Sequence, residues 1–284
     1  MQILRNKNEL RAWVSMQRME RNTIAFVPTM GALHDGHLSL VRLGQQKCTR
    51  CIASIFVNPK QFGKGEDFES YPRPLEKDIA ALETTRVSAL YLPDALEMYP
   101  EPFHTVVSVS PMKSILEGEF RPHFFDGVAT VVTKLLLQLL PDVALFGEKD
   151  YQQLQIIKTM VKDLDIPVQI FGGPTLRESD GLAMASRNVY LSAEERKKAP
   201  ALYQAMEYCR LEIMKQSKPV FEILEAGKKK IAEAGFDSVD YLEYRDSESL
   251  DTITSPDKPG RLLAAARLGK TRLIDNIAVE RVMP

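Results

Sequence analysis

Cysteine is scarce in this chain, which has three among 284 residues. An odd number in a chain of this length favours free thiols in a reducing compartment, so we expect a cytoplasmic protein without a disulfide framework. Cys48 and Cys51 are spaced as C-x-x-C, which occurs in redox pairs and zinc sites. However, Cys51 begins the apolar run CIASIFV, and no histidine lies close in sequence. Buried packing is therefore the favoured interpretation of the pair.

Net charge is also nearly absent, because 37 Lys and Arg offset 38 Asp and Glu. This balance argues against a broad basic surface for nucleic acid and leaves room only for a local basic cleft. No apolar run reaches the roughly 18 residues of a membrane helix. The closest run, residues 128–140, contains Lys134 and Gln138, and the N-terminus lacks the apolar region of a secretory signal. We expect neither nucleic acid nor membrane as a partner.

The length suggests about two domains, and the first part of the chain alternates strand and helix signals. The expected strands are residues 23–27, 51–57, 89–92, 142–146 and 168–171, and the expected helices are residues 37–47, 75–83 and 151–164. Such alternation is typical of βαβ units in an α/β fold, with a parallel sheet covered by helices on both faces. Ligands bind such sheets beyond the carboxyl ends of the strands.

After about residue 176 the pattern changes to that of a small α+β domain. A capping box at residues 192–195 opens a helical pattern that extends to about residue 216. A second helix follows Pro219 and ends near Gly235. Three strand-like segments come next, at residues 239–244, 261–266 and 272–282, with a loop at residues 255–260.

The densest cluster of polar and small residues is PTMGALHDGH, residues 28–37, between a predicted strand and a predicted helix. It holds two of the four histidines, His34 and His37. In this position, imidazole N–H groups and helix N-terminal amides are expected to converge on an anion. Gly31 and Gly36 are expected to let the backbone turn tightly and approach a phosphate. The alternatives are a glycine turn with two exposed histidines, or a metal site whose further ligand the sequence does not identify.

Three more polar clusters follow strands or lie at the domain junction. They are residues 58–62 (NPKQF), 147–153 (GEKDYQQ) and 179–188 (SDGLAMASRN). Lys149 supplies a point charge for phosphate, and Arg187 supplies a planar fork of donors. Each cluster taken alone is equally compatible with a solvated helix start or a surface cation.

Taken in order, five segments resemble one enzyme family, the pantoate–β-alanine ligases. They are PTMGALHDGH, SIFVNPKQF, LFGEKDYQQL, DGLAMASRN and RLIDN. HDGH alone is similar to the H-x-G-H element of a wider nucleotidylyltransferase superfamily, shared with class I aminoacyl-tRNA synthetases. The resemblance implies a Rossmann-like domain at residues 1–176, a small α+β lid domain at residues 177–284, and a homodimer.

The resemblance also implies a two-step reaction with ATP as a substrate and Mg²⁺ as its companion. The carboxylate of (R)-pantoate attacks the α-phosphorus of ATP, giving pantoyl adenylate and pyrophosphate. The amine of β-alanine then attacks the adenylate, giving pantothenate and AMP. The implied catalytic residues are the proton donor His37 together with His34, Lys149 and Arg187.

The implied ATP site draws on several segments: Met30, Gly31, Ala32, Leu33, His34, Asp35, Gly36 and His37; Gly147, Glu148, Lys149 and Asp150; and Leu176, Met184, Ala185, Ser186 and Arg187. Lys149 is expected to hold phosphate, and Asp150 the ribose or the magnesium shell; no direct protein ligand to metal is assigned. Gln61 and Gln153 are implied to bind the pantoate hydroxyls, with Gln61 and Asn58 near β-alanine. Neutral amides suit a ligand whose hydroxyls both donate and accept.

Two positions depart from the family pattern. Residues 121–128 read RPHFFDGV where relatives often have R-P-G-H-F-x-G-V, so His123 is given no role. Ala185 stands where relatives often have serine, so one hydroxyl contact to phosphate is expected to be missing. The alternatives are another nucleotidylyltransferase or adenylate-forming enzyme of the superfamily, or a non-catalytic nucleotide- or RNA-binding module. The absence of a K-M-S-K-S-like loop argues against a synthetase, and the balanced charge argues against the RNA module.

Overall fold

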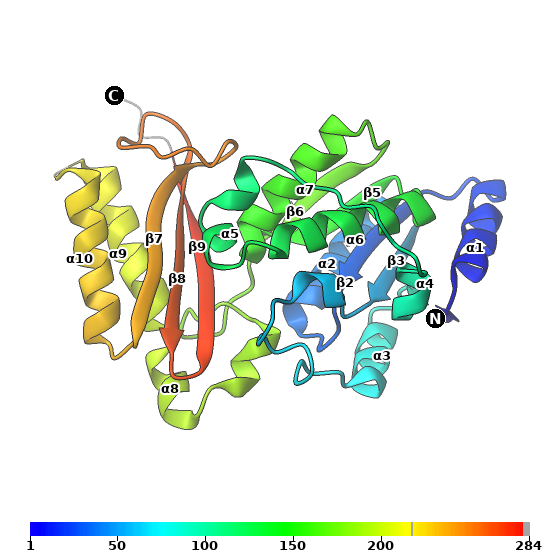
Figure 1. Ribbon diagram of the computed structural model, residues 1–284, viewed down its shortest axis with the longest axis horizontal. Helices are drawn as coiled ribbons and strands as arrows, with labels where there is room; N and C mark the ends of the chain where they lie inside the picture. Colours follow the sequence, from blue (N-terminus) through cyan, green and yellow to red (C-terminus); the bar gives the residue numbers. More distant parts are fainter. Residues whose placement is uncertain (217, 281–284) are drawn as a thin grey trace. The chain divides into compact units, whose positions relative to one another are not determined.

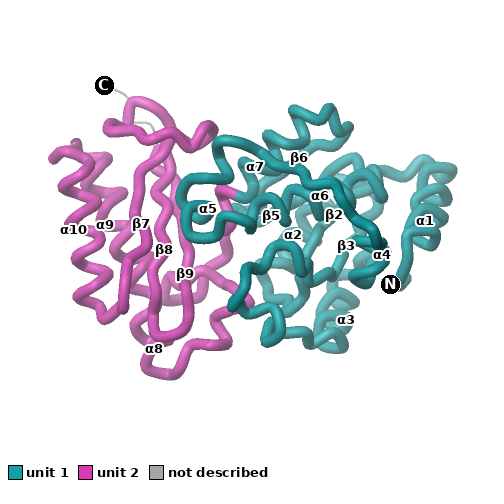
Figure 2. The backbone as a smooth tube through the Cα atoms, viewed as in Figure 1, with its two compact units in different colours: residues 1–148, 153–174 teal, residues 149–152, 175–284 magenta. Residues whose placement is uncertain are grey.

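The computed structural model describes residues 1–216 and 218–280 (Figure 1). These residues form two compact units (Figure 2). Unit 1 comprises residues 1–148 and 153–174, and unit 2 comprises residues 149–152 and the chain from residue 175 onward. The main boundary between the two units, after residue 174, lies two residues before the expected boundary at residue 176. The sequence does not indicate that residues 149–152 group with the second unit.

Unit 1 is built on a six-stranded sheet in the order β1-β4-β3-β2-β5-β6, with every neighbouring pair parallel. The strands are β1 (Gln2–Leu4), β2 (Ile24–Thr29), β3 (Arg50–Ile55), β4 (Ala89–Tyr91), β5 (Val143–Gly147) and β6 (Gln169–Gly173). The five expected strands are confirmed with small shifts at their ends. The short edge strand β1 is not among the strands that the sequence predicts.

Helices cover both faces of this sheet, as the alternation predicts. On one face, side chains of α2 (Asp35–Lys47) and α3 (Leu75–Thr84) share a buried cluster with Leu90 of β4. Side chains alternate along a strand, so Tyr91 faces the other side. There its hydroxyl donates to Gln138 Oε1 of helix α6, residues Phe124–Leu139 (3.1 Å). The remaining helices of this part are α1 (Lys7–Met19), α4 (Ala95–Met98), α5 (Glu117–Phe120) and α7 (Tyr151–Asp163).

Helix α6 (Phe124–Leu139) contains most of the longest apolar run in the chain, and the sequence pattern does not identify it as a helix. Its residues are buried on nearly all sides, so the polar stripe that marks a surface helix is missing. None of the helices within the described residues is long and apolar enough to span a membrane.

The strand order reverses beside β2. From β2 the chain continues through β3 and β4 on one side, and later through β5 and β6 on the other. Crossover connections leave in opposite directions at such a point, and sheets of this kind bind ligands there, beyond the carboxyl ends of the strands. The cluster at residues 28–37 follows β2 at this point.

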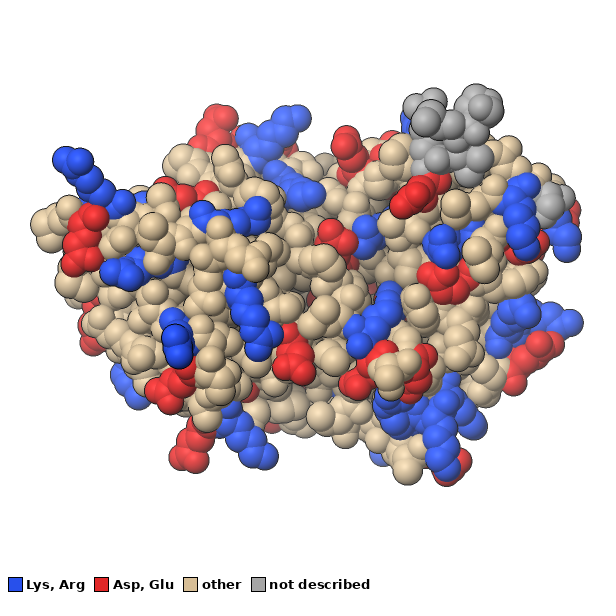
Figure 3. Space-filling model, turned by 180° about the vertical axis from the view of Figure 1, so that it is seen from behind, with Lys and Arg blue, Asp and Glu red and all other residues tan. Residues whose placement is uncertain are grey.

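Charges of both signs are interspersed on the face shown in Figure 3. Several surface charges form ion pairs, such as Arg18 with Asp142 (2.6 Å) and Arg196 with Asp180 (2.6 Å). Exposed pairs of this kind contribute roughly 0–1 kcal/mol each to stability. The fold therefore depends chiefly on its buried apolar side chains.

Unit 2 contains the antiparallel sheet β7 (Ser238–Asp246), β8 (Gly260–Leu268) and β9 (Thr271–Val279), with helices α8 (Ala193–Lys198), α9 (Ala201–Lys215) and α10 (Val220–Glu233). The capping box is confirmed at Ser192 and Glu195. The single helix expected up to residue 216 is wrong, because Pro200 lacks the N–H that a continuous helix needs. Gly260 begins β8 rather than ending a loop. The strand expected up to Val282 ends at Val279, and residues 281–284 lie outside the described residues.

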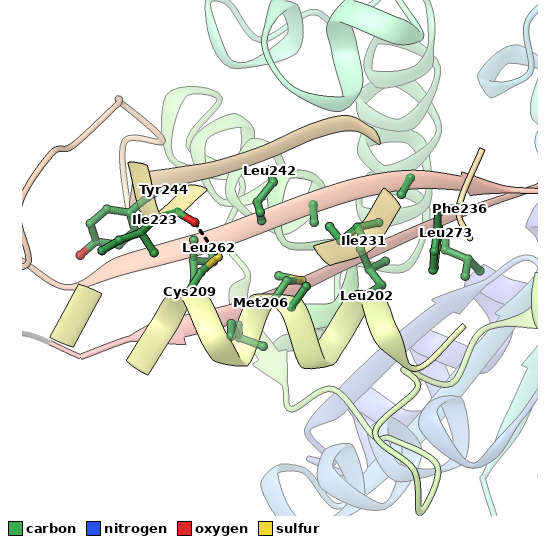
Figure 4. Packing of buried hydrophobic residues seen from close by; sticks show 14 of the residues in the cluster. Leu202, Met206, Cys209, Ile223, Ile231, Phe236, Leu242, Tyr244, Leu262 and Leu273 are labelled. Carbon is green, nitrogen blue, oxygen red and sulfur yellow. Dashed lines mark hydrogen bonds between the residues drawn. The ribbon is translucent and has the colours of Figure 1, made fainter. Parts of the chain in front are cut away.

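The core of unit 2 forms where α9 and α10 pack on this sheet (Figure 4). Met206, Ile231 and Leu262 are each fully buried there. Cys209 lies among them, and burial raises the pKa of its thiol to about 12. Cys48 and Cys51 are likewise buried free thiols, and burial raises the pKa of Cys51 to about 12. The three cysteines pack as small apolar side chains, as expected.

We predict that Leu262→Ala lowers the free energy of unfolding by about 2–5 kcal/mol, because it leaves a cavity in this core. Phe221 of α10 is 67% exposed, so Phe221→Ala is the matched control and should change stability by roughly 0.5 kcal/mol or less. Chemical denaturation followed by circular dichroism measures both. Equal losses in the two variants would show that this core is not the main source of stability.

Candidate functional site

Three loops of unit 1 lie at the carboxyl edge of the sheet, after the neighbouring strands β3, β2 and β5 (Figure 1). Parallel strands present their carboxyl ends on one edge, so the three loops share that edge. They carry the expected site residues of unit 1, which are Met30 to His37, Asn58, Gln61, Gly147, Glu148 and Gln153. Gln153 is half-buried in the first turn of α7.

The two histidines are held by the start of helix α2. His34 is the N-cap residue, and its Nδ1 accepts the backbone N–H of Gly36 (3.2 Å). His37 Nδ1 accepts the backbone N–H of His34 (3.3 Å), and the ring centroids are 4.1 Å apart. A neutral imidazole that accepts at Nδ1 carries its proton on Nε2. Both rings therefore present Nε2–H donors at a helix N-terminus, where anions are stabilised.

The glycines of this loop have different roles. Gly31 has φ +83° and Ala32 has φ +49°, so the chain turns through two left-handed residues. Gly36 is expected to serve the turn, but it lies inside the first turn of α2. A Cβ at Gly36 would lie 2.8 Å from Cε1 of His34, so this glycine admits the imidazole ring. Asp35 is exposed at the first position of the helix.

Buried amides connect the loops after β2 and β3. Asn58 Nδ2 donates to Gln61 Oε1 (3.1 Å), and Gln61 Nε2 lies 2.8 Å from Met30 Sδ. The Tyr99 hydroxyl donates to Asn58 Oδ1 (2.7 Å). Burial raises the pKa of Tyr99, so its hydroxyl keeps the proton that it donates. This network fixes the orientation of the Gln61 amide.

Helix α6 and the segment before it support the same loop. Asn58 Nδ2 also donates to the carbonyl of Gly127 (3.1 Å). A Cβ at Gly127 would lie 2.2 Å from the Lys60 carbonyl oxygen, so only glycine permits this approach. Arg121 donates to the carbonyl of Gln61 (3.3 Å) and pairs with Glu66 (2.5 Å). The segment that departs from the family pattern thus still holds Gln61.

His123, to which the sequence assigns no role, is exposed at the N-cap position of α6 and makes no capping hydrogen bond there.

In unit 2, Lys149 and Asp150 precede α7, with Nζ of Lys149 3.6 Å from Oδ1 of Asp150. The carbonyl of Lys149 accepts from Asn276 Nδ2 (2.8 Å). Tyr151 donates to the carbonyl of Ser247 (2.8 Å). The Arg261 guanidinium stacks on the Tyr151 ring, 3.8 Å from its centroid. These contacts explain why residues 149–152 group with the antiparallel sheet.

The other expected residues of unit 2 lie in one folded loop. Met184 N–H donates to the carbonyl of Leu176 (2.9 Å). The short 3-10 helix Ser186–Tyr190 follows, carrying Ser186 and Arg187, with Ala185 as its N-cap residue. Arg177 forms a two-pronged ion pair with Asp275 (2.6 and 2.9 Å), which ties the loop to β9. RLIDN therefore supplies Asp275 and Asn276 as anchors for two separate loops.

The sequence does not predict the supporting roles of Asp78, Tyr99 and Gly127. It also does not predict a role for the individual residues of RLIDN. One signal is available for Asp78. It lies four residues before the buried Leu82, on the core-facing side of a short amphipathic helix. A carboxylate at such a position needs buried hydrogen-bond donors.

Comparisons with known proteins agree over the whole chain. The family model described as pantoate-beta-alanine ligase matches residues 2–278. A pantothenate synthetase of Paramagnetospirillum magneticum is 55% identical over 278 residues, covering 98% of both chains. One from Hyphomonas neptunium is 51% identical, covering 99% of this chain and 97% of the other.

Solved structures give the same result. The crystal structure of a pantothenate synthetase from Thermus thermophilus matches with a TM-score of 0.92 and 45% identity over all of both chains. A pantoate-beta-alanine ligase from Francisella tularensis, complexed with beta-gamma ATP and beta-alanine, matches with a TM-score of 0.82 and 34% identity. This match covers 98% of this chain and 97% of the other.

The family resemblance implies that Gln61 binds pantoate. We predict that Gly127→Ala raises the KM for pantoate, because the new Cβ displaces Lys60 and Gln61. The loss should be about 1–3 kcal/mol, that of a broken buried hydrogen bond. Leu137→Ala is the matched control, since Leu137 lies on the same helix but is 52% exposed. Steady-state kinetics measure both, and an unchanged KM in Gly127→Ala would contradict this role of α6.

Proposed function

The chain belongs to the pantoate–β-alanine ligase family, and we propose on this basis that it joins (R)-pantoate to β-alanine at the expense of ATP. The products are pantothenate, AMP and pyrophosphate, formed through pantoyl adenylate. One observation carries the proposal. Two imidazole Nε2–H donors lie at the N-terminus of α2, beside a loop whose buried amide Gln61 has a fixed orientation.

In the first step, the pantoate carboxylate attacks the α-phosphorus, and negative charge grows on the phosphate oxygens and the leaving pyrophosphate. His34 and His37 donate to these oxygens, with His37 as the proton donor. A fixed donor of this kind contributes on the order of 3 kcal/mol to the transition state in other enzymes. Lys149 adds a point charge and Arg187 a planar pair of donors. The other residues of the ATP site that the family resemblance implies border the nucleotide.

Pantoate is held through its hydroxyls by Gln61 and Gln153. Gln61 is suited to this task because Asn58 and Met30 fix its amide in one orientation. A hydroxyl can accept from an amide N–H and donate to an amide oxygen. β-Alanine binds near Gln61 and Asn58, and its amine attacks the acyl carbon of the adenylate in the second step.

ATP enters with Mg²⁺ in this scheme. The described residues contain no cluster of three or more His, Cys, Asp or Glu side chains that could hold a metal ion. Magnesium bound with nucleotides often takes one or two carboxylates, with phosphates and water as its other ligands. Asp150, whose side chain is 46% exposed, is suited to be such a carboxylate ligand. When bound, the ion offsets negative charge on the phosphates.

The homodimer implied by the family resemblance and a cytoplasmic location are part of the same proposal. The three free cysteines support a reducing compartment. The main competing function is transfer of the nucleotidyl group to another acceptor, as in other members of the superfamily. Dependence on pantoate separates the two.

We predict that the enzyme with ATP, Mg²⁺ and pantoate exchanges labelled pyrophosphate into ATP without β-alanine. The reason is that the substrate's own carboxylate is the nucleophile, so the first step needs no amine. Exchange without pantoate would identify a different acceptor and overturn the substrate assignment. A requirement for β-alanine would favour a concerted reaction over an adenylate intermediate.

We predict that His34→Ala and His37→Ala each lower the rate of this exchange by on the order of 100-fold or more, the effect of losing a transition-state donor. His104 is exposed and outside the three loops, so His104→Ala is the control and should retain the wild-type rate. Near-wild-type exchange in both loop variants would refute the assignment of the histidine pair.

A further inference from the structure

One buried carboxylate, which the reaction does not use, contacts the histidine loop. Asp78 lies in the first turn of α3 and is 3% exposed. Its Oδ2 accepts the backbone N–H of Ala32 (2.8 Å), and its Oδ1 accepts that of Leu33 (2.8 Å). Both oxygens therefore bind consecutive residues immediately before His34.

This carboxylate is held without an ion-pair partner among the described residues. Burial raises its pKa above the ordinary value of 3.8, and the hydrogen bonds from Leu33 and Ala32 only partly offset this effect. Because the pKa of Asp78 is higher in the folded than in the unfolded chain, protonation of Asp78 stabilises the fold below about pH 4. This stabilisation is lost as the pH rises through the folded-state pKa. Burial thus disfavours the ionised form of Asp78 relative to the protonated form. Costly groups of this kind concentrate at functional sites.

The loop that Asp78 holds has an unusual backbone. Gly31 and Ala32 both have positive φ, which an alanine adopts only at an energetic cost. A Cβ at Gly31 would lie 3.0 Å from Asp78 Oδ2, so glycine at this position leaves room for the carboxylate. The two hydrogen bonds from Ala32 and Leu33 thus fix the turn that delivers the chain to His34.

The orientation of this turn determines the positions of the two histidine rings, because backbone N–H groups that follow the turn donate to both rings. The backbone N–H of His34, one residue beyond Leu33, donates to Nδ1 of His37 (3.3 Å). The ring of His34 accepts from Gly36 two residues further on (3.2 Å). These bonds determine which nitrogen of each ring carries the proton.

We propose that Asp78 is a positioning residue that holds the turn at residues 31–33, so that the Nε2–H groups of His34 and His37 face the phosphates in the transition state. The proposal rests on the function proposed above. Asp78 does not touch a substrate and acts through the backbone. Pantoate-dependent exchange by the wild-type enzyme tests that function by itself, and the variants below test only Asp78.

The first experiment is Asp78→Asn, which keeps the shape of the side chain. It replaces one acceptor oxygen with an NH₂ group that faces a backbone N–H. The kcat of pyrophosphate exchange should fall on the order of 10- to 100-fold, the effect of a small misplacement of catalytic groups. The pantoate KM should stay within about twofold, because an interaction made only in the transition state changes kcat.

Asp142→Asn is the matched control. Asp142 also accepts a backbone N–H, that of Ile24 (2.6 Å), and it pairs with Arg18, but it lies at the amino end of the sheet. This variant should lower stability and leave kcat unchanged. A loss of kcat in Asp142→Asn equal to that in Asp78→Asn would show that both effects are merely structural and would overturn the proposal.

Amide hydrogen exchange gives a readout without turnover. In the wild-type protein, the amides of Ala32 and Leu33 should exchange slowly for a loop, and Asp78→Asn should remove this protection while β3 keeps its own. Fast exchange of both amides in the wild type would overturn the proposal, and this measurement stands even if the variant does not fold. A variant with wild-type kcat, or with reduced kcat and unchanged loop protection, would overturn it as well.

Discussion

The parallel hydrogen bonding of β2 with both β3 and β5 is the constraint on which the rest of unit 1 depends. It places three loop-bearing carboxyl ends on one edge, with the histidine loop in the middle. The strand order reverses at the same place, which is where sheets of this kind bind ligands. No single loop residue creates this geometry. The apolar residues of β2, buried from both faces, establish it by pairing in register with their neighbours.

A second pattern is the use of backbone groups to orient polar side chains. His34 and His37 are oriented by main-chain N–H groups, and Asn58 is tied to a main-chain carbonyl. Main-chain groups in regular structure move less than side chains, so a functional group bound to them loses little precision. In unit 2, the ion pair between Arg177 and Asp275 holds a loop in place in a comparable way.

Much of the fold was predictable because its strands are short apolar runs separated by turns, as for Ile24–Thr29 and Arg50–Ile55. Helix α6 was not predicted, because a helix that is buried on nearly all sides has no polar residues repeating every 3.6 positions. The helix predicted through Pro200 failed because the capping box and the apolar spacing outweighed one proline. Among site residues, the motifs identified the groups assigned to the ligands. Asp78 and Tyr99 hold those groups from distant parts of the sequence, and only the tertiary contacts reveal them.

The grouping of residues 149–152 with unit 2 bears on how such a chain can be divided or recombined. A fragment that ends at residue 174 contains the whole six-stranded sheet, yet its Lys149 carbonyl lacks Asn276 and its Tyr151 ring lacks Arg261. Conversely, a chimera that takes its C-terminal third from a relative inherits a new anchor for Lys149 without any change near that lysine. Two units that are each compact are thus interleaved along the sequence. The segment that bears the proposed phosphate-binding cation is anchored by β8 and β9, more than a hundred residues further along the chain.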